Sequence, residues 1–240
     1  MKLKVEGLVA VAGLVLFCMS VPAAGQQVVS VQYTGGYSTV WGNSDGTFGA
    51  GIYTATINGA PSSGIICDDY NDEITTNETW NAKAYNVSTL VSSGNLGNTL
   101  FGNTIGVTGY AEVATLVSMM FSGTSTFGSI TGITQAELSS AIWNLTTPGG
   151  ISGLDAKATA LVLAVKAAFN GNAAAATSYL ASLKNLWILT PTPLGPGEPQ
   201  EMWTQNLQLA EGGAALMYLC LTGLFCSGAF YLRRREQLSN

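Results

Sequence analysis

Residues 52–66 read Ile-Tyr-Thr-Ala-Thr-Ile-Asn-Gly-Ala-Pro-Ser-Ser-Gly-Ile-Ile, and this stretch indicates the class of fold. Its first six residues are rich in β-branched and aromatic side chains, which favour a strand. Asn58-Gly59 is a dipeptide preferred in tight β-hairpin turns, and a second apolar run ends at Ile65-Ile66. We therefore expect a hairpin here, although the connection to the second run is longer than two residues.

The β pattern extends on both sides of this stretch and returns near the end of the chain. Residues 26–75 as a whole favour strands, because partly alternating apolar residues are separated by glycine-containing turns. Residues 186–189 and 202–209 also have strand-like composition. We expect these two late segments to complete the sheet.

The middle of the chain has helical periodicity instead. Four helices are expected, at residues 110–121, 135–144, 154–170 and 172–184. Thr134 and Glu137 have the spacing of a capping box at the start of the second helix. The short loop between the last two helices predicts an antiparallel helical hairpin.

Together these patterns predict an α+β domain over residues 26–209. We expect a β-sandwich-like N-terminal sheet with the helices grouped against it. Proline and glycine residues are concentrated at 190–200, which predicts a surface loop between the two late strands.

The composition excludes several classes of function. The chain has no histidine, so it cannot build Ser-His-Asp or Cys-His nucleophile systems or histidine-containing zinc sites. Residues 26–210 contain four lysines, no arginine and eleven acidic residues, a net charge of −7. A nucleic-acid partner is not expected, because it requires a basic surface.

The N-terminal residues 1–25 have the layout of a secretory signal peptide. Lys2 and Lys4 form a basic start, residues 7–19 are apolar, and small residues follow at 21–25. The alternative is an uncleaved anchor. Either interpretation predicts that the chain is directed to a membrane.

The C-terminal segment 210–240 contains a second apolar run. Residues 212–232 include no charged residue, and a helix at about 1.5 Å per residue over this length crosses a bilayer core of about 30 Å. We predict a transmembrane helix at 213–232. The basic end at 233–235 should stay in the cytoplasm, which leaves the domain outside it.

The whole tail resembles a PEP-CTERM-type sorting signal. The resemblance depends on Glu211, Gly212 and Gly213, on the apolar helix, and on Arg233, Arg234 and Arg235. It implies processing by an exosortase-like enzyme in Gram-negative bacteria that export polysaccharide. The family's motif has a proline before the glutamate, and alanine stands there in this chain. Two destinations follow: an inner-membrane-anchored protein with its domain outside the cytoplasm, or a cell-surface or extracellular protein after processing.

Cys67 is the single cysteine of the predicted domain, so no internal disulfide can form there. Asp68 and Asp69 follow it directly. Because neighbouring carboxylates disfavour a thiolate, we do not expect a catalytic cysteine nucleophile.

A strand ending at Cys67 and a later helix containing Ala141-Ile142-Trp143 together resemble bacterial thioester domains, over roughly residues 47–210. The resemblance implies an internal thioester between the cysteine and a glutamine, able to capture an amine or hydroxyl on a host surface. Ser139 stands at the family's glutamine position. Gln135, one helical turn earlier, is therefore the candidate partner of Cys67. The alternative is a degenerate relative in which Cys67 is a small buried apolar residue.

The densest acidic cluster of the domain consists of Asp68, Asp69, Asp72 and Glu73. Oxygen ligands of this kind can hold calcium, although the spacing is not that of an EF-hand. The alternative is a solvated loop. Paired carboxylates could also serve glycoside hydrolysis, but neighbours on one loop seldom face each other across a sugar.

Three hypotheses follow. The first is a non-enzymatic structural or adhesion component of the bacterial envelope or extracellular matrix, held by the C-terminal helix and in contact with extracellular polysaccharide. Its weakly charged surface, rich in Gly, Ser, Thr and Asn, suits hydrogen bonding to hydrated glycans. The second is a thioester-bearing covalent adhesin, and the third is a polysaccharide-active hydrolase. No catalytic residue is assigned, and no cofactor is expected apart from the calcium candidate.

Overall fold

The computed structural model describes residues 26–44, 46–193 and 199–207, within a unit that spans Gly25–Leu207. The predicted signal peptide 1–25 and the whole C-terminal segment 210–240, with the predicted sorting motif and transmembrane helix, lie outside the described residues. The elements, in chain order, are β1 (Gln26–Asn43), β2 (Gly46–Ile57), β3 (Ala60–Pro61), β4 (Ile65–Cys67), β5 (Thr79–Asn86), α2 (Val87–Ser92), η1 (Leu96–Asn98), α3 (Gly102–Ser122), β6 (Thr126–Phe127), β7 (Ile130–Thr131), α4 (Gln135–Thr146), α5 (Ala156–Phe169), α6 (Ala173–Ser182), β8 (Leu186–Pro191) and β9 (Met202–Gln205).

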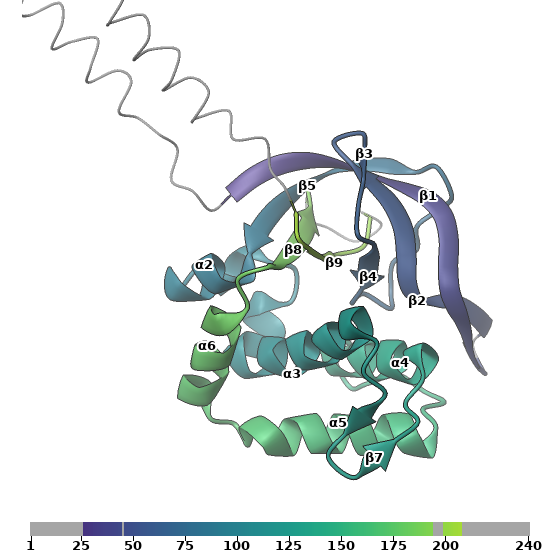
Figure 1. The fold of residues 1–240 in the computed structure, drawn as a ribbon, viewed down its shortest axis with the longest axis vertical. Coiled ribbons are helices and arrows are strands. Elements are labelled where there is room, and N and C mark those ends of the chain that lie inside the picture. The colour runs from purple at the N-terminus through teal and green to yellow at the C-terminus, as the bar shows by residue number, and fades with distance from the viewer. Residues whose placement is uncertain (1–25, 45, 194–198, 208–240) are drawn as a thin grey trace, which may run out of the picture. The chain divides into compact units, whose positions relative to one another are not determined.

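The long strand β1 closes the main sheet into a barrel (Figure 1). Its first part pairs with β5, and its second part pairs with β2. The order β1-β5-β8-β9-β4-β2 therefore returns to β1, with every neighbouring pair antiparallel. The short strand β3 pairs with β2 outside this ring.

The prediction of a sandwich-like sheet is wrong, because the pairing of β1 with β2 closes the sheet into a barrel. The pairing of β1 with β2 shifts register between Tyr33 and Tyr37, next to Gly35 and Gly36, whose φ angles are +88° and +92°. An irregularity of this kind bends a strand and increases its twist. One continuous sheet can then curve back on itself, so no second facing sheet is formed.

The turn predicted at Asn58-Gly59 is confirmed. Both residues have positive φ, +53° and +78°, as a two-residue type I′ hairpin requires. Ile57 pairs with Ala60 across the turn. The chain then continues past β3 to the second apolar run at β4.

The helices lie together on one side of the barrel (Figure 1), which confirms the α+β class. The expected antiparallel hairpin of the last two helices is wrong. Although α5 ends as predicted at Asn170, which has φ +45°, α6 packs mainly against α2 and α3. The reason is that α6 buries Ala176 and Leu180 in the shared core, which draws it away from α5.

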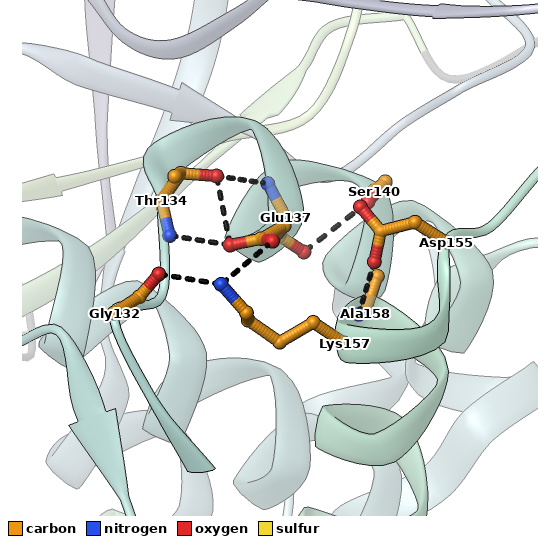
Figure 2. Close-up of polar contacts among 7 residues, drawn as sticks. All are labelled: Gly132, Thr134, Glu137, Ser140, Asp155, Lys157 and Ala158. Atoms are coloured by element: carbon orange, nitrogen blue, oxygen red, sulfur yellow. Dashed lines mark hydrogen bonds and ion pairs between the residues drawn. The ribbon is translucent and has the colours of Figure 1, made fainter.

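The predicted capping box at the start of α4 is also confirmed (Figure 2). Glu137 N donates to Thr134 Oγ1 at 3.2 Å, and Thr134 N donates to Glu137 Oε2 at 2.6 Å. Lys157 of α5 forms an ion pair with Glu137 at 3.2 Å and donates to Gly132 O at 2.7 Å. These contacts hold one face of α4 against α5 and leave its other face for the barrel.

Buried side chains form two groups on either side of the barrel wall. Ile66 belongs to the core shared with the helices, together with Trp203 and Ile142. Ile65 and Cys67 are equally buried but lie outside that cluster. Because successive strand residues point to opposite faces, these two point into the barrel.

Within the described residues, α3 is the helix that is long and apolar enough to cross a membrane. Half of its most apolar stretch is buried against the domain, as is usual for a core helix. The transmembrane helix at 213–232 stays a prediction.

Candidate functional site

A cavity of about 250 Å³ lies beside the end of β4. Residues of β1, β2, the loop after β4, α4 and the segment before β9 line it. Six of the lining residues are aromatic: Tyr33, Tyr37, Phe48, Tyr53, Tyr70 and Trp143. The polar lining includes Gln200 and the carboxylates Asp69, Asp72 and Glu73. We name this the aromatic cavity; a concave site with a few convergent polar groups is typical of small-ligand binding.

Gly49 organises the tyrosines on one side of the cavity. The Tyr53 hydroxyl donates to Gly49 O at 2.6 Å. A Cβ at position 49 would lie 2.7 Å from Tyr37 Cδ1, so the Tyr37 ring rests directly on the glycine. Tyr33 meets Tyr53 edge to face, with ring centroids 5.8 Å apart. The buried tyrosines are thus fixed, while Tyr37 remains 51% exposed.

A second aromatic group forms the opposite wall. Tyr70 contacts Phe48 with centroids 5.1 Å apart and Trp143 with centroids 5.9 Å apart. Trp41 contacts all three rings from the core side. Trp143 is 3% exposed, and its indole lies beside the Cys67 thiol, on whose pKa it acts. The indole that closes this wall therefore already contacts the buried thiol.

The carboxyls of Asp69 and Asp72 lie next to each other at the cavity. Burial raises the pKa of Asp69 to about 6; the backbone N–H of Asn71, donated at 3.0 Å, opposes this shift, and the neighbouring Asp72 carboxyl adds to it. Glu73 is exposed beside them. Negative charge is therefore concentrated on this side of the cavity.

The Cys67 thiol lies just behind the cavity wall. Its Sγ donates to Asp69 O at 2.9 Å and accepts from Asp69 N at 3.3 Å, and the residue is 1% exposed. Burial raises the pKa of the thiol well above its usual value, and the carboxylates of Asp68 and Asp69 raise it further, against the opposing effect of the Trp143 indole. The expectation of a disfavoured thiolate is confirmed.

The structure does not bring Gln135 to Cys67. The Gln135 side chain accepts a hydrogen bond from Ser38 Oγ and lies against Gly51, at the first turn of α4. The helix residue beside the thiol is Trp143, eight positions later, which corresponds to about 12 Å along the helix axis. Gln135 lies in the first turn of α4, whereas Cys67 lies beside a later part of the same helix, at Trp143.

Gln200 is the glutamine that lies near the thiol, and it was not predicted from the sequence. Its Nε2 donates to Asp69 O at 3.0 Å and to Asp72 O. Because Cys67 Sγ bonds the same Asp69 oxygen, the amide and the thiol are at most two hydrogen-bond lengths apart. The pairing of Cys67 with Met202 between β4 and β9 produces this proximity.

Asp68 turns away from the other three acidic residues. Its Oδ2 accepts from Trp203 Nε1 at 2.5 Å, its Oδ1 has no partner among the described residues, and the residue is fully buried. Burial raises the pKa of Asp68 well above its usual value, and the adjacent Glu201 raises it further.

Glu201, equally buried, was also missed from the sequence. Burial raises the pKa of Glu201, against the effect of the groups that donate to it. It accepts from Leu100 N at 2.8 Å, Tyr110 OH at 2.7 Å and Thr190 Oγ1 at 2.6 Å. These bonds join β8 and β9 to α3, so the role of Glu201 is structural.

No group of three or more cysteine and acidic side chains that could hold a metal ion is found among the described residues. The four acidic residues of the predicted calcium site do not come together. Asp68 accepts a hydrogen bond from Trp203, whereas Asp69, Asp72 and Glu73 line the aromatic cavity. The geometry gives the calcium hypothesis no support.

No protein family, curated protein or solved structure matches the chain. Its own residues define an α+β domain in which residues of a closed barrel, its loops and α4 line an acidic, aromatic cavity. The arrangement suits reversible binding of a small polar ligand or of one unit of a polymer.

Proposed function

We propose that the protein is an exported, non-enzymatic component of the bacterial envelope or extracellular matrix that contacts polysaccharide through the aromatic cavity. The observation that carries this proposal is the lining of that cavity: six aromatic rings together with three carboxyls and one side-chain amide. Aromatic faces stack on the apolar faces of sugar rings, and carboxylates and amides hydrogen-bond to hydroxyls. The half-exposed Tyr37 offers a ring to an approaching chain.

The state of the reactive groups supports a non-enzymatic role. The Cys67 thiol is buried and has a raised pKa, which disfavours the nucleophilic form. The Asp69 and Asp72 carboxyls interact with each other, whereas glycosidases need two carboxyls separated by the scissile bond, about 5 Å or more apart. Binding without turnover fits this arrangement better than hydrolysis.

Attachment to the envelope is proposed from the two ends of the sequence. The signal-like residues 1–25 and the tail that resembles a PEP-CTERM signal direct the domain out of the cytoplasm. An exosortase-like enzyme is the proposed processing partner. Cell fractionation tests both destinations: a released form without residues 213–232 supports processing, and a form found only at full length in the inner membrane supports a permanent anchor.

The binding proposal is tested by titrating the full-length protein in detergent with oligosaccharides and following tryptophan fluorescence. Tyr37→Ala should weaken binding by a few-fold to about tenfold, because stacking on an aromatic ring contributes about 0.5–1.5 kcal/mol. Tyr179→Ala is the matched control, since Tyr179 contacts Phe169 in the helical layer and does not line the cavity. Equal weakening by both variants would contradict the proposal.

A second candidate, the thioester adhesin, is favoured by one observation: Cys67 and Gln200 bond the same oxygen of Asp69. In that reaction the Sγ–Cδ bond forms, the Cδ–Nε2 bond breaks, and ammonia leaves with the thiol proton. Intact-mass measurement decides. A deficit of one ammonia that disappears in Cys67→Ala and Gln200→Ala but persists in Gln135→Ala supports this candidate; the full calculated mass excludes it.

A further inference from the structure

The aromatic cavity combines its rings with an excess of negative charge. Three carboxyls line it, and none of the four lysines of the described domain does. Gln200 does not neutralise the carboxyls, because its Nε2 is bonded to the main-chain oxygens of Asp69 and Asp72. A ligand that brings positive charge would therefore meet complementary groups.

The carboxyls and aromatic rings of the cavity together favour a ligand that carries a positive charge on a polar ring. The Asp69 carboxyl is held beside that of Asp72, and a positive group between them would relieve their repulsion. Tyr70 and Trp143 line the same cavity, and a cation over an aromatic face gains further attraction.

We propose that the aromatic cavity binds amine-bearing sugar units, such as hexosamine residues with a free ammonium group, in preference to neutral or acidic sugars. This inference rests on the proposed polysaccharide contact and names its chemical class. The ammonium group pairs with Asp69, Asp72 and Glu73, while the sugar ring stacks on the aromatic wall. An acidic sugar would bring a carboxylate towards like charges.

The test is isothermal titration calorimetry of the full-length protein with three probes of equal length: oligomers of glucosamine, of N-acetylglucosamine and of glucuronic acid. We expect the glucosamine oligomer to bind at least about tenfold more tightly than its acetylated counterpart, with a preference that decreases as salt is added. Glucuronic acid oligomers should bind most weakly. Glu73→Gln and Asp72→Asn should each reduce the preference for the glucosamine oligomer several-fold, with a smaller loss of affinity for the acetylated oligomer, because the amide keeps a hydrogen-bonding group but loses the charge.

Glu78→Gln is the matched control, since it removes one negative charge from the same stretch of chain but not from the cavity lining. Glu73 is exposed, so its substitution should leave the fold intact. Equal affinity for the charged and acetylated oligomers would overturn the inference and leave the proposed glycan contact standing. A preference unaffected by Glu73→Gln and Asp72→Asn but reduced by Glu78→Gln would also overturn it. Absence of binding by every probe would overturn both proposals.

Discussion

Replacing Asp68 by asparagine should change how the stability of the domain depends on pH. The carboxyl is fully buried, and its pKa in the folded protein is raised well above 3.8 by burial and by the nearby Glu201. A group whose folded-state pKa is raised contributes stability that is present below its unfolded-state pKa, near pH 4, and is lost as pH rises through the folded-state value. The wild-type protein should therefore become less stable as pH rises above about 4.

The magnitude follows from the number of protons involved. One group that titrates in the unfolded but not yet in the folded state lowers the unfolding free energy by about 1.4 kcal/mol per pH unit. Asp69 acts in the same direction: its shift from 3.8 to about 6 corresponds to about 3 kcal/mol, reduced by solvent in the cavity. Asp68→Asn removes the pH dependence that comes from the Asp68 carboxyl. The oxygen of the asparagine side chain can still accept the hydrogen bond from Trp203.

The assay is urea unfolding of wild type and Asp68→Asn at several pH values from about 5 to 8, followed by near-UV circular dichroism. The difference between their unfolding free energies should move in favour of the variant as pH rises, by up to about 1.4 kcal/mol per unit. Glu73→Gln, which removes an exposed carboxyl, is the control. Parallel pH profiles for wild type and Asp68→Asn would refute the reasoning.

Three further predictions concern stability, and the same urea unfolding measures each of them. Glu201→Ala should lower the unfolding free energy by about 3–5 kcal/mol, because two buried hydroxyls and one partly buried backbone N–H lose their acceptor; a loss below 1 kcal/mol would contradict the network. Gly51→Ala should cost about 1–3 kcal/mol, since its φ is +83° and a Cβ would overlap Ser38 Oγ and Gln135 Oε1; an unchanged midpoint would show that α4 can move away. Lys157→Met should cost no more than about 1 kcal/mol, because its ion pair is partly exposed, and a larger loss would show that it has a greater role in positioning α4.

Local signals in the sequence predicted local structure well. The capping box at Thr134 and Glu137, the turn at Asn58-Gly59 and the helix end at Asn170 each depend on contacts within a few residues. Such contacts leave a recognisable pattern in the sequence. The positions of α4, α5 and α6 and the α+β class could be predicted for the same reason, whereas α2 and the start of α3 were not predicted.

Closure of the barrel could not be predicted in this way. It depends on β1 pairing with β5 at one end and with β2 at the other, and strand pairing over long separations has no local signature. The packing of α6 against α2 and α3 could not be predicted either, because its small apolar residues do not specify which helix they contact. Tertiary packing decided both features.

The candidate site was predicted in part. Cys67 and the acidic residues after it were identified from their types and spacing, and three of these acidic residues line the aromatic cavity. Gln200 was missed because it lies in a segment predicted only as a Pro/Gly-rich loop, and its position depends on the pairing of β4 with β9. The different positions of Asp68 and Asp69 could not be predicted either. Two adjacent aspartates give no signal in the sequence of which side chain is buried against Trp203 and which one lines the cavity.

The position of a bound oligosaccharide tests the central claim most directly. A crystal structure of the full-length protein with a glucosamine oligomer should show a sugar ring in the aromatic cavity, stacked on Tyr37 or Tyr70, with its amino group beside Asp69 and Asp72. An oligosaccharide bound elsewhere on the domain, with the aromatic cavity empty, would contradict the account.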